Sequence, residues 1–255
     1  MCRKIEHQAA DSELTLDEFL GGSIRAWQPA KGFRAGIDSV LLAGAIPAEP
    51  GQEVLELGCG VGVAALCLLR RVAGAHATGL EVQPQYAELA QRNARLNGFA
   101  LEILVGDVAD PPGVIKSASF GQVCANPPYH RAGTAVPPAD MGRAASVIEQ
   151  VPLSAWVGLA FDVLDEGGWL TMILPSGRHD EFISALPAFA GTVLVKPVVP
   201  HKGKPANRIL VRARKGGKRK IMQSDSLILH ELNGGGYTAE TEGLLRGGNA
   251  VPFRL

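Results

Sequence analysis

The sequence has few aromatic residues and no long apolar run. Phe, Trp and Tyr make up 5% of its 255 residues, whereas glycine occurs 31 times. No stretch reaches the roughly 18 consecutive apolar residues of a membrane-spanning helix. Residues 1–10 carry charge where a secretion signal would be apolar. We therefore expect neither a membrane span nor a secretion signal, and place the protein in the cytoplasm.

The cysteines and the charge balance exclude further classes. Cys2, Cys59, Cys67 and Cys124 form no C-x-x-C pair and the histidines lack ligand spacing, so we expect no metal site. The last three lie in apolar runs typical of reduced core thiols. The 25 basic and 25 acidic residues cancel. That balance argues against indiscriminate coating of nucleic acid but allows a local basic patch.

Short apolar strands alternate with helical segments along most of the chain. The expected strands are Val54–Leu57, His76–Leu80, Leu101–Val105, Phe120–Ala125 and Trp169–Leu174. The expected helices are Ile37–Ile46 (capped by Asp38 or Ser39), Val63–Arg71, Pro84–Asn97, Val151–Leu164 and Glu181–Phe189. With an antiparallel C-terminal hairpin of Thr192–Val199 and Asn207–Ala213, these predict a mostly parallel seven-stranded sheet covered by helices on both faces.

The two ends of the chain differ from this alternation. Residues 1–20 are polar, so we expect partial disorder there, followed by a short strand at Ser23–Gln28. Leu227–His230 adds a strand and Thr238–Leu245 a last helix. We divide the chain into an N-terminal extension, residues 1–30, and one domain, residues 31–255.

A glycine-rich turn, residues 58–62 and hereafter the Gly-loop, follows the first strand of the alternation. Gly58, Gly60 and Gly62 give G-x-G-x-G, whereas a dinucleotide fingerprint requires G-x-G-x-x-G. Glu56, two residues earlier, would repel a pyrophosphate but suits the cationic amino-acid end of S-adenosylmethionine (SAM), usually through water. The turn therefore favours SAM over NAD.

The next two strands also end in acidic residues. Glu81 can accept both ribose hydroxyls, and Asp107 can bind the adenine amino group beside the Val108 N–H. Alternatively, Asp107 caps a turn. The order Gly-loop, Glu, Asp predicts the Rossmann-like SAM-dependent methyltransferase fold. The expected cofactor contacts are Gly36, Asp38, Glu56, Gly58, Cys59, Gly60, Glu81, Val82, Asp107, Val108 and Asn126.

The motif Asn126-Pro127-Pro128-Tyr129 follows the fourth strand, where the transferred methyl group must point. An exocyclic adenine nitrogen is a weak nucleophile because its lone pair is delocalised. The Asn126 side chain and the Pro127 carbonyl can accept its two N–H groups and support the positive charge that develops. Proline fixes the backbone, and Tyr129 can stack on the base. We expect Asn126, Pro127, Pro128 and Tyr129 to be catalytic. Asn in place of the Asp common in DNA enzymes favours RNA adenine or a protein amide.

The chain resembles the bacterial adenine-N6 methyltransferases that act on valine tRNA beside the anticodon. The resemblance covers about residues 20–250 and is carried by residues 33–42, by the Gly-loop with the Asn126–Tyr129 motif, and by residues 205–210 with 236–240. It implies that residues 33–42 close over the methionine end of SAM. It also implies methyl transfer to N6 of a tRNA adenine, with S-adenosylhomocysteine as product. The loop of residues 131–143 and the basic region of residues 196–220 depart from the family pattern.

Residues 196–224 contain ten Lys or Arg and no acidic residue. The segment is either a solvated hairpin or a patch that contacts RNA phosphates. The expected substrate contacts are Arg131, Arg143, Lys202, Lys204 and Arg208.

Two alternatives to a tRNA methyltransferase stay open. One is a glutamine-N5 methyltransferase acting on release factors, which usually carries a larger helical N-terminal domain. The other is a non-catalytic SAM- and RNA-binding protein. His130 is a further candidate to line the pocket, whereas Trp27, Trp156 and Trp169 are expected to pack in the core.

Overall fold

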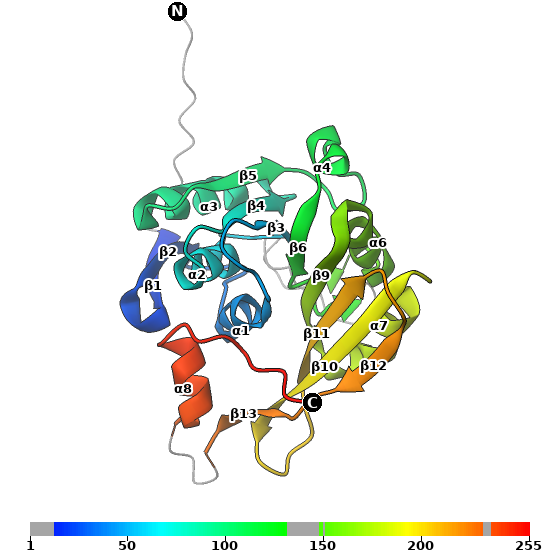
Figure 1. Ribbon diagram of the computed structural model, residues 1–255. Coiled ribbons are helices and arrows are strands. Elements are labelled where there is room, and N and C mark those ends of the chain that lie inside the picture. The colour runs from blue at the N-terminus through cyan, green and yellow to red at the C-terminus, as the bar shows by residue number, and fades with distance from the viewer. Residues whose placement is uncertain (1–12, 132–147, 150, 232–235) are drawn as a thin grey trace, which may run out of the picture.

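The computed structural model describes residues 13–131, 148–149, 151–231 and 236–255. It is an α/β structure built on one large, mainly parallel sheet (Figure 1). Among the described residues, no helix has both the length and the apolarity to cross a membrane.

The central sheet has the strand order β12-β10-β11-β9-β6-β3-β4-β5, with β13 also paired to β10. Five strands are mutually parallel: β3 (Glu53–Leu57), β4 (His76–Glu81), β5 (Leu101–Val105), β6 (Phe120–Ala125) and β9 (Leu164–Pro175). β11 (Arg208–Lys215) runs antiparallel between β9 and β10 (Ala190–His201). These seven strands confirm the predicted sheet and its antiparallel hairpin. β12 (Lys220–Gln223) is an additional short strand that the sequence did not suggest, and β13 (Leu227–His230) matches its predicted bounds.

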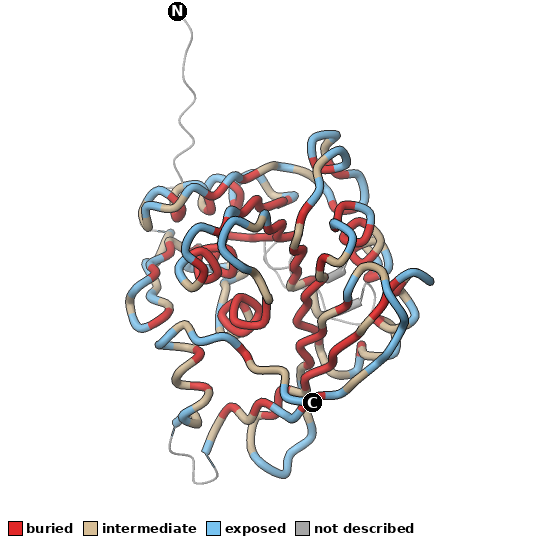
Figure 2. The backbone as a smooth tube through the Cα atoms, in the orientation of Figure 1, coloured by how far each residue is buried: buried red, intermediate tan, exposed pale blue. Residues whose placement is uncertain are grey.

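Two hydrophobic clusters lie on opposite faces of this sheet, so its central strands are buried on both sides (Figure 2). Along β6, Val123 and Ala125 face one cluster while Cys124 faces the other. The first cluster receives α1 (Ile37–Ala45), α2 (Val63–Arg71) and α3 (Pro84–Asn97). The second receives α4 (Gly113–Ser117), α6 (Leu153–Val163) and α7 (His179–Ala185). The thiols of Cys59, Cys67 and Cys124 are buried as expected, with burial raising their pKa values.

Local signals fixed several helix ends correctly. α3 begins at Pro84, where the missing N–H costs nothing, and ends before Gly98, which adopts the left-handed conformation at φ +72°. α1 is one residue off the prediction at its C-terminus, and its N-cap is Gly36 rather than Asp38 or Ser39. Asp38 lies in the first turn instead, where a carboxylate is stabilised by the helix dipole.

The expectation of partial disorder in residues 1–20 was wrong for Leu14–Phe19. These residues form β1, which pairs antiparallel with β2 (Ile24–Pro29) across a 3₁₀ turn, Leu20–Gly22. Asn93 of α3 binds both the N–H and the carbonyl of Trp27, which holds the hairpin against that helix. The stabilising partner is 66 residues away along the chain, so no local pattern revealed it. The domain division at residue 30 stays a prediction.

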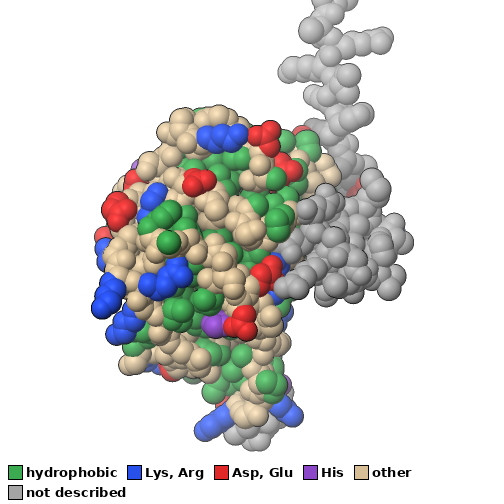
Figure 3. Space-filling model, turned by 90° about the vertical axis from the view of Figure 1, so that its right-hand side faces the viewer, with side chains coloured by type: hydrophobic (Ala, Val, Ile, Leu, Met, Phe, Trp, Pro, Cys, Tyr) green, Lys and Arg blue, Asp and Glu red, His purple; other side chains and the backbone are tan. Residues whose placement is uncertain are grey.

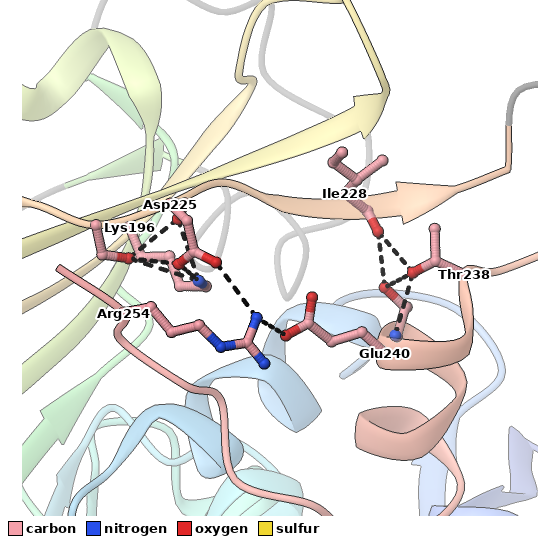
Figure 4. A network of polar contacts seen from close by, with 8 residues as sticks. Lys196, Asp225, Ile228, Thr238, Glu240 and Arg254 are labelled. Atoms are coloured by element: carbon pink, nitrogen blue, oxygen red, sulfur yellow. Dashed lines mark hydrogen bonds and ion pairs between the residues drawn. The ribbon is translucent and has the colours of Figure 1, made fainter.

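The C-terminal residues fold back over α1 and the edge of the sheet. Thr238 caps α8 (Ala239–Leu245) and binds the Ile228 carbonyl of β13. Lys196 is fully buried, with its Nζ 2.6 Å from Asp225 Oδ1. Arg254 bridges Asp225 and Glu240, so these segments form one network (Figure 4).

Candidate active site

A cavity of about 430 Å³ opens at the carboxyl ends of β3, β4, β5 and β6. This is the edge at which open α/β sheets bind ligands, and the volume suits a small-molecule site. The predicted site residues that line it are Gly36, Asp38, Gly58, Gly60, Glu81, Val82, Asp107, Val108, Asn126, Pro127, Pro128, Tyr129 and Arg208. Glu56 and Cys59 are absent from its walls. Residues from six separate segments thus meet in one hollow.

The Gly-loop requires glycine for both conformation and space. Gly58, Gly60 and Gly62 all have positive φ, at +65°, +54° and +85°. A methyl group on Gly58 would lie 2.8 Å from the Trp156 ring, and one on Gly60 would lie 3.3 Å from the Phe33 ring. Phe33 belongs to the stretch expected to close over the cofactor, and its backbone N–H donates to the Tyr86 hydroxyl. The loop therefore has no side chains between its backbone and the cavity at Gly58 and Gly60.

Glu81 fixes the Gly-loop and also lines the cavity. Its Oε2 accepts from the Gly60 N–H at 2.8 Å, and its Oε1 accepts from the Gln83 N–H at 2.9 Å. Burial raises the pKa of this carboxyl, an effect opposed by those backbone hydrogen bonds. Each oxygen retains a second lone pair for a ligand hydroxyl. Its role as a ribose acceptor remains a prediction.

Glu56 lies beneath the loop instead of facing the cavity. It is 4% exposed and accepts from the Ala65 N–H, in the first turn of α2, at 2.9 Å. Burial, with a smaller contribution from Glu81, raises its pKa from 4.5 to about 8. The raised pKa favours the protonated form of the Glu56 side chain at neutral pH. A water-mediated contact with the cationic end of SAM gains no support from this placement.

We predict that Glu56 makes stability fall as pH rises. The folded protein holds a proton that the unfolded chain releases near pH 4.5, so the free energy of unfolding decreases between that pH and about pH 8. Glu56→Gln removes this dependence, and its stability relative to wild type is expected to increase by roughly 3–4 kcal/mol between about pH 5 and about pH 8. Urea unfolding at the two pH values measures it. Glu53→Gln, an exposed change on the same strand, is the control. Equal pH slopes for Glu56→Gln and wild type would contradict the prediction.

Asp107 and Val108 follow β5 at the cavity wall. Asp107 Oδ1 accepts from the Ala109 N–H at 2.8 Å, which is the turn-capping role considered as the alternative. Both residues still line the cavity. Turn capping and adenine binding are compatible, because the cap occupies only one carboxylate oxygen.

The Asn126–Tyr129 motif has one free end and one anchored end. Asn126 Oδ1 is buried and has no hydrogen-bond partner within the described part of the chain. By contrast, the Pro128 carbonyl accepts from Arg178 Nη1 at 3.1 Å, and the Tyr129 hydroxyl donates to Asp38 Oδ2 at 2.5 Å. An unpaired buried carbonyl costs about 1–3 kcal/mol. An amino group entering the cavity could supply its missing donor.

Several cavity residues were not predicted. Trp156 of α6, expected in the core, is 8% exposed and lines the cavity, and its indole Nε1 has no hydrogen-bond partner among the residues described. Phe33, within the stretch expected to close over SAM, was not singled out, and Gln83 and Val151 were also missed. Only tertiary packing brings α6 to the Gly-loop, so the sequence carried no signal for Trp156.

The predicted substrate contacts separate into three groups. The side chain of Arg131 and all of Arg143 lie outside the described residues, as does the side chain of His130. Lys202 and Lys204 are exposed in the turn between β10 and β11. Arg208 is only partly exposed and its Nε lies 2.7 Å from Asp38 Oδ1, so it faces the cavity.

The basic segment of residues 196–224 is less available to RNA than its composition suggested. Lys196 is buried, while Arg212, Lys215 and Arg219 donate to backbone carbonyls of Ala45, Phe161 and Pro187, among others. The exposed bases are Lys202, Lys204, Arg214, Lys218, Arg219 and Lys220. On the face shown in Figure 3, basic side chains alternate with acidic and apolar ones. Part of the segment's charge therefore serves the fold, while the exposed residues remain accessible.

Comparisons with known proteins identify similar methyltransferases. The family model described as the methyltransferase small domain matches residues 34–151. The chain is 29% identical over 219 residues to the tRNA1(Val) (adenine(37)-N6)-methyltransferase of Porphyromonas gingivalis, covering 79% of this chain and 83% of that protein. It is 30% identical over 147 residues to the release factor glutamine methyltransferase of Geobacter sulfurreducens, covering 52% and 49% respectively.

A solved structure supports the same fold. The crystal structure of a protein from Agrobacterium tumefaciens, described as a predicted O-methyltransferase, superposes with a TM-score of 0.70 at 25% identity. The match covers 84% of this chain and 98% of that protein. The predicted Rossmann-like methyltransferase fold is confirmed.

Proposed function

Because this chain belongs to the SAM-dependent methyltransferases, we propose that it transfers a methyl group from SAM to the exocyclic N6 of a tRNA adenine. The observation that carries the proposal is Asn126 Oδ1, a buried carbonyl beside Pro127 at the end of β6 that has no hydrogen-bond partner in the part of the chain that the structure describes. Because Asn126 is a lining residue of the cavity, the proposal assigns an amino group of the substrate as the donor to this carbonyl. A tRNA substrate also implies a cytoplasmic enzyme.

The cavity residues suggest how each half of the reaction is held. Gly58 and Gly60 leave the backbone open to the methionine end of SAM, Glu81 would accept the ribose hydroxyls, and Asp107 the adenine amino group. When bound, SAM supplies an electrophilic methyl group on its sulfonium. Asn126 and the Pro127 carbonyl would bind the two N–H groups of the acceptor and support the positive charge that develops on nitrogen. The methylated nitrogen then loses its proton readily, so no strong base is required.

A labelling experiment tests the proposal. We expect the protein, incubated with methyl-labelled SAM, to label bulk tRNA at a single adenine, with digestion and mass analysis locating the modified nucleotide. Label in a release factor but not in tRNA would support glutamine-N5 transfer instead. The partial match to the release factor enzyme is the observation that favours this second candidate. Bound SAM without label in either substrate would support a non-catalytic role.

The exposed turn between β10 and β11 carries a separate prediction about RNA binding. Because Lys202 and Lys204 are exposed and neither forms an ion pair with another described residue, we propose that they contact phosphates. Each alanine substitution should lower the slope of log affinity against log salt by about one and weaken binding to all tRNAs alike. Fluorescence anisotropy over a salt series measures this, with Lys116→Ala on the distant α4 as control. An unchanged slope would remove the turn from the RNA interface.

A further inference from the structure

We propose that Arg178 and Arg208 are positioning residues that hold the Tyr129 end of the Asn126–Tyr129 motif in place. They act through the Pro128 carbonyl and through Asp38. The inference rests on the proposed function for the motif's catalytic role. It goes beyond it by assigning a task to two arginines outside residues 34–151, the range matched by the family model.

The first anchor fixes the Tyr129 ring. The Tyr129 hydroxyl donates to Asp38 Oδ2 at 2.5 Å, and Arg208 Nε lies 2.7 Å from Asp38 Oδ1. Asp38 stands in the first turn of α1, where the helix dipole favours its negative charge. Burial and the Asp38 carboxylate raise the pKa of Tyr129, so its hydroxyl remains a donor. The ring is thus tied to α1 and β11 at its far end.

The second anchor fixes the backbone one residue earlier. Arg178, at the end of the 3₁₀ turn Ser176–Arg178, has a side chain only 6% exposed. It binds Glu181 with two nitrogens, Nη2 to Oε1 at 2.7 Å and Nε to Oε2 at 3.1 Å. This paired arrangement orients the guanidinium so that Nη1 reaches the Pro128 carbonyl at 3.1 Å.

The two anchors leave the other end of the motif for the substrate. Asn126 Oδ1 has no partner among the described residues, while Pro128 and Tyr129 are both held. Methyl transfer depends on the alignment of the acceptor nitrogen with the sulfonium, and small displacements are costly. Because Asp38 and Arg208 orient the Tyr129 ring, they would also orient a flat base stacked on that ring. At Arg178 the two-nitrogen contact with Glu181 needs the planar guanidinium, because lysine offers no fixed fork of donors. At Arg208 the guanidinium Nε lies beside Asp38.

The arrangement predicts a specific kinetic signature. Arg208→Lys and Arg178→Lys should each lower kcat by about 10–100-fold, while the Kd for SAM stays within about twofold of wild type. Arg214→Lys is the matched control, since Arg214 is an exposed arginine of the same strand that donates to the Gly167 carbonyl. Tyr129→Phe should reproduce the loss, and the double variant with Arg208→Lys should lose no more than the larger single loss. Additive losses, or kcat within about twofold of wild type in both lysine variants, would overturn the proposal.

A measurement that needs no acceptor separates this proposal from the function itself. The chain has three tyrosines, so 3-fluorotyrosine labelling gives three fluorine resonances, with Tyr129 assigned by its absence in Tyr129→Phe. Arg208→Lys should shift or broaden the Tyr129 resonance and leave those of Tyr86 and Tyr237 unchanged. An unchanged Tyr129 resonance would overturn the role of Arg208. If wild type labels no RNA, the proposed function fails, whereas the fluorine spectrum still decides whether Arg208 holds Tyr129.

Discussion

Replacing Asn126 with alanine should lower turnover by about 100–1000-fold while leaving SAM affinity nearly unchanged. Asn126 lines the cavity and its side-chain carbonyl has no hydrogen-bond partner within the described residues, and we propose that its bond to the acceptor nitrogen strengthens as positive charge develops there. An interaction made mainly in the transition state affects kcat rather than ground-state binding. Removing it should not disturb the Gly-loop or Glu81, with which it shares no hydrogen bond.

Single-turnover methylation of tRNA and calorimetric SAM binding measure the two effects of Asn126→Ala. Asn249→Ala is a suitable control, because Asn249 is exposed and lies near the C-terminus beyond α8. If Asn126→Ala turns over within about tenfold of wild type, the proposed catalytic role is incorrect. A parallel loss of SAM affinity would instead place Asn126 in cofactor binding.

The second large effect is expected for the cofactor. Glu81→Ala should raise the Kd for SAM by about 10–100-fold, the range for loss of hydrogen bonds to a charged group. Two changes combine, because the variant removes the proposed ribose acceptor and also the bond that holds the Gly60 N–H. Turnover at saturating SAM should fall much less, since Glu81 is not among the residues we assign to the acceptor.

Calorimetry with SAM and with S-adenosylhomocysteine provides the measurement for Glu81→Ala. Glu102→Ala, an exposed change on the adjacent β5, is the matched control. Glu81→Gln retains one acceptor oxygen and should give an intermediate Kd. Unchanged SAM binding in Glu81→Ala would exclude Glu81 from the cofactor site.

The parts of the site that the sequence predicted are those encoded at strand ends. A parallel sheet brings the carboxyl ends of its strands to one edge, so residues such as Gly58, Glu81 and Asn126 could be grouped before any contact was known. The glycine-rich turn could be recognised from the sequence because few other residues tolerate positive φ. Glu56 lies at the same end of β3 as the Gly-loop, but its side chain turns inward toward α2. Its place two residues before Gly58 in the sequence did not reveal that direction.

The residues that sequence analysis missed or assigned differently depend on contacts between distant segments. Asp38 and Tyr129 are 91 residues apart, and Arg178 and Pro128 are 50 apart, so neither pair leaves a local pattern. Composition was also a poor guide to the basic segment, because burial of Lys196 depends on where Asp225 lies in the folded chain. Charge counts record which residues are present and not which of them face the solvent.

The register between β9 and β11 sets a rule for insertions and deletions. Arg208 pairs with Pro175 across the sheet, and the Asn207 carbonyl accepts from the Ser176 N–H. These contacts fix the segment that carries Arg178 relative to the segment that carries Arg208. Side chains alternate faces along a strand, and a slip of one residue would turn Arg208 away from Asp38. Length changes between Lys202 and Pro205 can be absorbed by the turn, whereas one at Asn207 would move the arginine. Homologues should therefore differ in loop length before this point and keep a constant spacing after it.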